Sequence, residues 1–141
     1  MTVMRAPTLY TPAILAAATG LAAWPWDDSL ACTGEARSRA CGSSLAIGLA
    51  RDDAGRISAI GLRMHACAIG QAAAQVFASH AVGQTRAMIA DARGALGAWL
   101  TGEGAMPDWP GLALIAAAQA YPSRHGAIVL AWDAALDALK I

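Results

Sequence analysis

The stretch "SLAIGLARDDAGRISAIGLRMHACAIGQAAAQ", residues 44–75, decides the fold of this 141-residue chain. Its first part alternates large apolar and small residues, which predicts a half-buried strand over 44–51. The letters "DDAG" at 52–55 predict a tight turn, and 56–63 reads as the returning strand. From Cys67 the apolar spacing becomes helical and continues for about four turns. The stretch therefore predicts an antiparallel hairpin that leads directly into a helix.

Helix signals occur on both sides of this hairpin, and the segment between residues 25 and 39 is irregular, with a short strand expected near its end. Thr11 and Pro12 suit the N-cap and first position of a helix, and Thr85 suits the N-cap of another. Together these signals predict an α+β fold, in which a small antiparallel sheet of about three strands packs against several helices in a single domain, 1–141. The expected helices are 12–24, 67–81, a helix between Thr85 and Gly102, a short one ending near Ala120, and a last one opened by Pro122.

Composition excludes several classes of function. The formal net charge is zero and no basic patch occurs, which argues against nucleic-acid binding. The apolar segment 12–24 is shorter than the roughly 20 residues that span a bilayer, so no membrane association is expected. The same segment resembles a signal peptide, which keeps an exported structural protein as an alternative. Three cysteines without paired spacing favour a reducing compartment and a cytoplasmic location.

Two cysteines stand at the ends of the predicted hairpin. Cys67 begins a helix, where the positive end of the helix dipole favours a thiolate. Cys41 precedes Gly42 and the first strand of the hairpin. Because the two strands are antiparallel, Cys41 and Cys67 are expected at the same end of the sheet. The alternative is that a lone cysteine among alanines is a small core residue.

The segment "CGSSLAIGLARDDAGRISAIGLRMHACAIGQAAA" resembles the core of the U-type iron–sulfur cluster scaffolds, namely the NifU N-terminal domain, IscU and SufU. Their pattern is Cys-Gly-Asp, a strand, an acidic-Gly turn, Gly-Arg-Ile, a second strand, and a cysteine at a helix start. "AVGQT" at 81–85 resembles their helix break. "YPSRHGAIVLAWDAAL" at 121–136 resembles their terminal Pro-x-Arg-x-x-Cys-Ala helix. The resemblance covers most of residues 10–140 and implies a SufE/NifU-like domain.

The resemblance also implies the ligands of a metal site. Cys41 and Cys67 stand at family cysteine positions, whereas Ser43 replaces the family aspartate and the third cysteine falls on Gly126. His125 is then implied as a third ligand, since a helix start disfavours the imidazolium and leaves a lone pair for metal; a capping histidine is the alternative. Three other residues complete the set of candidates: Cys32 as a fourth ligand or a structural thiol, and His65 and His80 as structural residues, the latter on a buried helical stripe.

The function implied is that of a non-enzymatic scaffold. It would hold iron, zinc or a labile [2Fe–2S] cluster, receive sulfur from a cysteine desulfurase, and pass its cargo to apo iron–sulfur acceptor proteins. The "LPPVK" segment that some family members show to an Hsp70-type chaperone is absent, which argues against a dedicated chaperone partner. The alternative is a degenerate member that binds or regulates a desulfurase without a cluster. The oligomeric state and the identity of the metal stay open.

Overall fold

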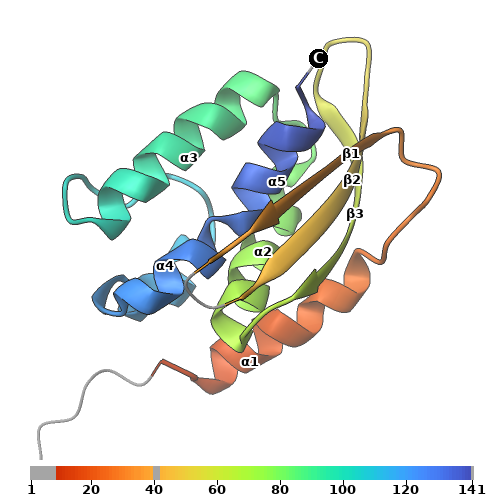
Figure 1. Ribbon diagram of the computed structural model, residues 1–141. Helices are drawn as coiled ribbons and strands as arrows, with labels where there is room; N and C mark the ends of the chain where they lie inside the picture. Colours follow the sequence, from red (N-terminus) through yellow and green to blue (C-terminus); the bar gives the residue numbers. More distant parts are fainter. Residues whose placement is uncertain (1–8, 40–41, 141) are drawn as a thin grey trace, which may run out of the picture.

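A computed structural model describes residues 9–39 and 42–140 of this protein (Figure 1). It contains a three-stranded antiparallel sheet in the order β1-β2-β3, with α2 and α5 packed against one face. The expected α+β fold is confirmed. The elements are α1 (Pro12–Thr19), η1 (Gly20–Ala23), β1 (Cys32–Arg37), β2 (Ser44–Arg51), β3 (Ile57–His65), α2 (Ala68–Ala81), α3 (Arg86–Leu100), η2 (Leu112–Ala120), α4 (Pro122–Ile128) and α5 (Leu130–Ala138).

The hairpin of β2 and β3 forms where the sequence predicted it. Asp52 organises its turn, because one carboxylate oxygen accepts hydrogen bonds from the backbone N–H groups of Ala54 and Arg56 at 2.9 and 3.0 Å. Gly55 supplies the positive φ of 78° that this turn requires. At the other end of the hairpin Ser44 pairs with His65. The start of β2 and the end of β3 therefore lie side by side, as the predicted antiparallel pairing implied.

The inner face of the sheet is covered closely by α5. Leu45, Ile47 and Leu49 point to this side and are at most 2% exposed. Gly34 of β1 permits the approach, because a Cβ there would collide with the backbone of Ala134 in α5. The opposite, outer face carries the small residues of β2.

The apolar N-terminal segment is folded as a helix in this structure. Thr11 caps α1 by accepting a hydrogen bond from the N–H of Ile14 at 3.2 Å, and Pro12 is the first helical residue, as predicted. Ile14 is 1% exposed, in a helix that packs on α2. Across the described ranges, no helix is both long and apolar enough to cross a membrane.

Two sequence predictions about helices are wrong. His80 was expected on a buried stripe of α2, yet it is exposed next to Ser79, on the solvent side of a helix whose buried face continues to Ala81. The last helix was expected to be continuous from Pro122, but it divides at Val129, whose ψ of −6° departs from the helical value near −42°. The break separates α4, at one end of the sheet, from α5 along its inner face (Figure 1).

Aromatic packing joins three segments that lie far apart in the chain. The ring of Phe77 in α2 stacks on Trp109, with centroids 5.3 Å apart, and meets Trp132 of α5 edge-on at 5.2 Å. The indole N–H of Trp109 donates to the carbonyl of Val76 at 2.9 Å. The loop between α3 and η2 is thereby fixed against the core, and α2 is held in place behind the sheet.

Candidate cysteine site

Cys67 is the N-cap residue of α2 and follows closely on the end of β3. The sequence predicted the first turn of the helix, and the structure puts the residue one position earlier, with φ −64° and ψ 166°. Its carbonyl accepts a hydrogen bond from the N–H of Gln71 at 3.0 Å, while its side chain makes no capping bond. The half-buried thiol lies at the positive end of a 14-residue helix, a position that favours negative charge.

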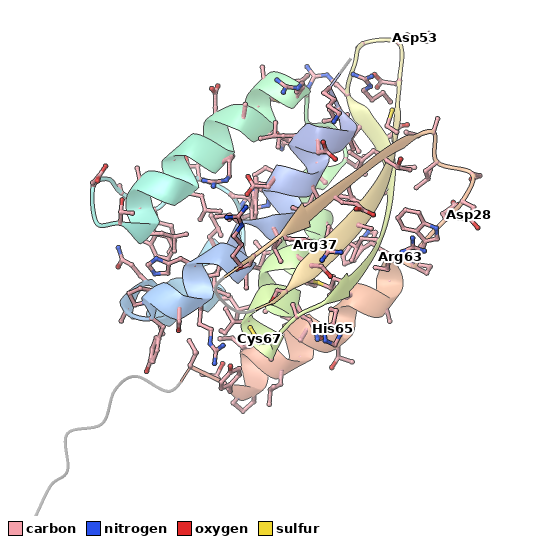
Figure 2. All side chains as sticks on the ribbon, in the orientation of Figure 1. Asp28, Arg37, Asp53, Arg63, His65 and Cys67 are labelled. Carbon is pink, nitrogen blue, oxygen red and sulfur yellow. The ribbon has the colours of Figure 1, made fainter. Side chains whose placement is uncertain are left out.

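The Cys67 side chain borders a polar hollow of about 290 Å³, which we call the Cys67 hollow. A thiol, an imidazole and a guanidinium are thereby brought to one place. Figure 2 shows His65 and Cys67 at the same end of the sheet. The lining residues are Gly42, Ser43, His65, Ala66, Cys67 and Arg124.

The loop between β1 and β2 reaches this hollow, as the predicted convergence required. The N–H of Ser38 donates to the carbonyl of Ser43 at 2.8 Å, and the N–H of Gly42 donates to the carbonyl of Ser38 at 3.0 Å. These bonds close the loop on itself and bring Gly42 to the hollow of Cys67. Cys41 itself lies outside the described residues, so its place beside Cys67 stays a prediction.

His125, the other predicted ligand, borders a different hollow. Its Nε2 lies 2.8 Å from the carbonyl oxygen of Gln119, and it lines a cavity of about 220 Å³ together with Arg93 and Gly126. The structure therefore does not bring His125 together with Cys67. Its role as a ligand stays a prediction, in which Nδ1 would bind the metal while Nε2 keeps its contact with Gln119.

Two residues of the Cys67 hollow were not singled out as site residues from the sequence. His65 was taken as structural, yet it is exposed and shares the hollow with Cys67. The hairpin register gives the signal, because counting back from the turn pairs His65 with Ser44. Arg124 reaches the hollow from α4, where it follows Pro122 by two residues.

Cys32 lies far from this hollow. It begins β1 and pairs with Leu49, whereas the strand end near Cys67 pairs Arg37 with Ser44. Its half-buried side chain packs against the core. Of the two roles considered for Cys32, the structure excludes a fourth ligand beside Cys67 and supports a structural thiol.

No protein-family model and no curated protein matches this sequence. Among solved structures, the crystal structure of a nitrogen-fixing NifU-like protein (N-terminal) from Brucella abortus superimposes with a TM-score of 0.82. It is 26% identical, over 93% of this chain and 92% of that chain. This likeness supports the resemblance of the chain to the U-type iron–sulfur scaffold family.

Two further solved structures share the fold of this chain. One is a putative iron–sulfur cluster assembly scaffold protein for the SUF system from the thermophile Fervidobacterium islandicum AW-1. It has a TM-score of 0.82 at 20% identity, over 94% of this chain and 97% of that chain. The other is described as a hypothetical protein, with a TM-score of 0.66 at 17% identity over 91% and 97% of the two chains.

The structure corrects where the third U-type cysteine falls. A Cβ built on Gly126 would collide with Oγ of Ser38, which is buried at the end of β1. Ala127 instead points toward α2, since its Cβ lies 3.2 Å from a Cβ built on Gly70, one turn after Cys67. Counted from Pro122, the pattern Pro-x-Arg-x-x-Cys also ends at 127. The assignment to Gly126 is therefore wrong by one residue, and its glycine is explained by the close approach of Ser38.

Metal-binding side chains are sparse among the described residues. Within residues 9–39 and 42–140, no three histidine, cysteine, aspartate or glutamate side chains gather closely enough to hold a metal ion. Cys67 and His65 border one hollow, and Ser43 and Ala127 stand where the resemblance implies an acidic residue and a cysteine. The described donors thus supply two groups, and a third would have to come from outside this set.

Proposed function

We propose that this protein is an iron–sulfur cluster assembly scaffold that carries iron, zinc or a labile cluster as cargo and is not itself an enzyme. The observation that supports this most is the position of Cys67. Its half-buried thiol stands at a helix N-terminus, in an open polar hollow at the end of a NifU-like sheet. Such a site suits a thiolate that is reached by a partner and released again.

Cys67 and Cys41 are the proposed thiolate ligands of this cargo. For the third protein ligand we propose His65, because its imidazole borders the same hollow as Cys67. His125, which the family resemblance implies, is the competing candidate and is engaged with Gln119. Arg124 would balance the negative charge of thiolates and sulfide in the hollow.

The proposed sulfur donor is a cysteine desulfurase, and the recipients are apo iron–sulfur proteins. In the transfer step the Cys67 thiolate attacks the outer sulfur of a persulfide on the donor. The new S–S bond forms at Cys67, the old S–S bond breaks, and the donor cysteine leaves as a thiolate. The step needs no external oxidant or reductant, and the open hollow gives a donor loop access.

Anaerobic reconstitution with iron and sulfide tests the proposal. Wild-type protein is expected to develop the visible absorption of a cluster with stoichiometric iron, and Cys67→Ser and Cys41→Ser are expected to lose most of it. Cys32→Ser is the matched control, since it removes an equally half-buried thiol at the far end of β1. Equal iron in Cys67→Ser and Cys32→Ser would show that the cargo site lies elsewhere.

The sparse donor set supports a second candidate function. A U-type domain with Ser43 and Ala127 at family positions could bind and regulate a desulfurase without holding a cluster. In that case the purified chain would capture a desulfurase without taking up metal, and the double variant Cys41→Ser/Cys67→Ser would capture it equally well. Capture that depends on both cysteines would favour the scaffold role.

A further inference from the structure

The outer face of the sheet, opposite the core, carries a trough of about 330 Å³ next to the Cys67 hollow. We call it the outer-face trough. Its volume lies at the lower end of the range for small-molecule pockets, about 300–1,000 Å³. Two cross-strand rows form it, one of Arg37, Ser44 and His65 and one of Glu35, Ala46 and Arg63, with the member from β2 in the middle of each.

The geometry of the sheet brings the two arginines toward a common space. Ser44 and Ala46 are small, so the floor along β2 is low, while β1 and β3 stand on either side, about 9.5 Å apart. Arg37 and Arg63 belong to rows two residues apart, about 7 Å along the strands. Figure 2 shows both arginines on this stretch of the sheet, toward the end that holds Cys67.

Neither guanidinium has a hydrogen bond or ion pair to a side chain among residues 9–39 and 42–140. The side chain of Arg37 has no hydrogen bond or ion pair with any residue of 9–39 or 42–140, although its backbone pairs with Ser44. Arg63 stacks on the ring of Trp26, 4.2 Å from its centroid, and the indole N–H of Trp26 is fixed by Asp28 at 2.7 Å. Stacking orients a guanidinium while leaving its in-plane N–H donors free for a carboxylate. Arg63 is therefore held ready for an anion.

Glu35 adds a third charge to the same trough. Two guanidiniums and one carboxylate complement a ligand with two carboxylates and one ammonium group, which is the charge pattern of a small acidic peptide. His65 borders both the outer-face trough and the Cys67 hollow, so a ligand in the trough extends toward the thiol. We propose that the outer-face trough binds a small carboxylate-bearing peptide thiol, whose sulfur reaches the Cys67 hollow.

The thiol of this ligand has a specific use, which rests on the proposed scaffold function. The three proposed protein ligands, Cys41, Cys67 and His65, would leave the fourth position of a tetrahedral metal site open. A bound ligand would lose its thiol proton to solvent and form a metal–sulfur bond, thereby adding a thiolate to the protein ligands. No electron is transferred in this step. The chain would then hold its cargo with an exchangeable ligand, which suits release to an acceptor.

Binding of glutathione to the metal-free protein tests the trough by itself. We expect saturable binding of glutathione to the wild-type protein by titration calorimetry. The single variants Arg37→Gln and Arg63→Gln should each bind glutathione about tenfold more weakly, because each removes a charge-assisted hydrogen bond. Arg86→Gln, an exposed arginine on α3, is the matched control and is expected to bind like wild type. Circular dichroism verifies that the variants fold. No binding at millimolar glutathione, or equal affinity in all variants, would overturn the proposal.

S-Methylglutathione tests the thiol separately, since it keeps the charges and lacks the free sulfur. Both compounds are expected to bind the metal-free protein equally, but only glutathione should lengthen the lifetime of the iron-loaded state. Equal lifetimes with the two compounds would overturn the role of the thiol. Failure of the scaffold function gives a different result, in which Cys67→Ser retains its metal while glutathione still binds the trough.

Discussion

The two ends of the sheet each hold a half-buried cysteine, and their surroundings differ. At one end the start of β2, the end of β3 and the N-terminus of α2 meet, and Cys67 borders an open hollow with His65 and Arg124. At the other end Cys32 begins β1 opposite Leu49 and packs against the core. The two thiols are therefore similarly buried, but Cys67 borders an open polar hollow and Cys32 packs against the core.

This difference shows that the hairpin topology, more than the cysteine, creates the site. An antiparallel pair gathers one strand start and one strand end, and here a helix begins at the same place. The N-terminus of α2 adds a positive field directly beside Cys67. Variants at the two ends should accordingly separate effects on metal binding from effects on stability.

The largest expected effect concerns two neighbouring positions of α4 at the Cys67 end. Gly126→Cys should destabilise the fold by about 1–3 kcal/mol, because its Cβ collides with buried Ser38. Ala127→Cys should cost less and raise zinc affinity by at least about tenfold, since it points toward the turn after Cys67. Urea unfolding and zinc titration measure the two quantities. Unchanged affinity in a well-folded Ala127→Cys would contradict this orientation of α4.

Gly126→Ala isolates the steric part of that prediction. In an open helix, glycine to alanine is stabilising by about 1 kcal/mol. Here the added methyl group would meet Oγ and Cβ of Ser38, so we expect a lower free energy of unfolding. The double variant Gly126→Ala/Ser38→Gly should recover part of the loss, because it removes the collision. A more stable Gly126→Ala would place α4 farther from β1 than described.

The next effect distinguishes the two candidate histidine ligands. His65→Ala should weaken metal binding by about tenfold, whereas His125→Ala should leave it within about twofold. The reason is that His65 borders the Cys67 hollow and His125 contacts Gln119 elsewhere. Metal titration of both variants under anaerobic conditions measures the difference. A larger loss of metal affinity in His125→Ala than in His65→Ala would identify His125 as the third ligand, as the family resemblance implies.

A variant at the far end of the sheet should change stability alone. Asp52→Ala removes the acceptor of two backbone hydrogen bonds in the β2–β3 turn and should lower the free energy of unfolding by about 1 kcal/mol. Metal affinity should remain that of wild type, because the turn is at the opposite end of the hairpin from His65. A loss of metal affinity larger than the fraction of unfolded protein explains would show that the two ends of the sheet are coupled.

Much of the fold followed from local patterns in the sequence. The period of two along β2, the returning strand β3, the acidic-Gly turn and the caps at Thr11 and Thr85 are confirmed at the predicted places. These signals depend on neighbours within a few residues, so a single sequence contains them. The convergence of strand ends near Cys67 followed as well, because antiparallel pairing fixes it.

The features that the sequence did not reveal depend on contacts between distant segments. Position 126 needs a glycine because Ser38, which is distant in the sequence, lies against it. No local sequence pattern indicates this contact. The break at Val129 lets α4 and α5 follow different surfaces, although their apolar spacing reads as one helix. The outer-face trough likewise arises from three strands at once, with Arg37 and Arg63 on opposite sides.

The smallest expected effect lies between the two ends, on the free edge of β1. Asp137 of α5 accepts hydrogen bonds from Lys140 Nζ at 2.8 Å and from the N–H of Glu35 at 3.0 Å. The Lys140 bond first, and then the Glu35 bond, lower the pKa of Asp137 below its ordinary 3.8. A lowered pKa stabilises the fold above the unfolded value, and this contribution disappears as the pH falls from about 4 through the folded pKa.

Asp137→Asn should therefore lower stability slightly at neutral pH, and its difference from wild type should shrink below pH about 4. Because the Asp137 side chain is partly exposed, solvent and salt screen its interactions, so the difference should also shrink at high ionic strength. Urea midpoints across this pH range, at low and high salt, measure both trends. A difference that grows in acid would mean that protonated Asp137, and not the carboxylate, holds α5 to the edge of β1.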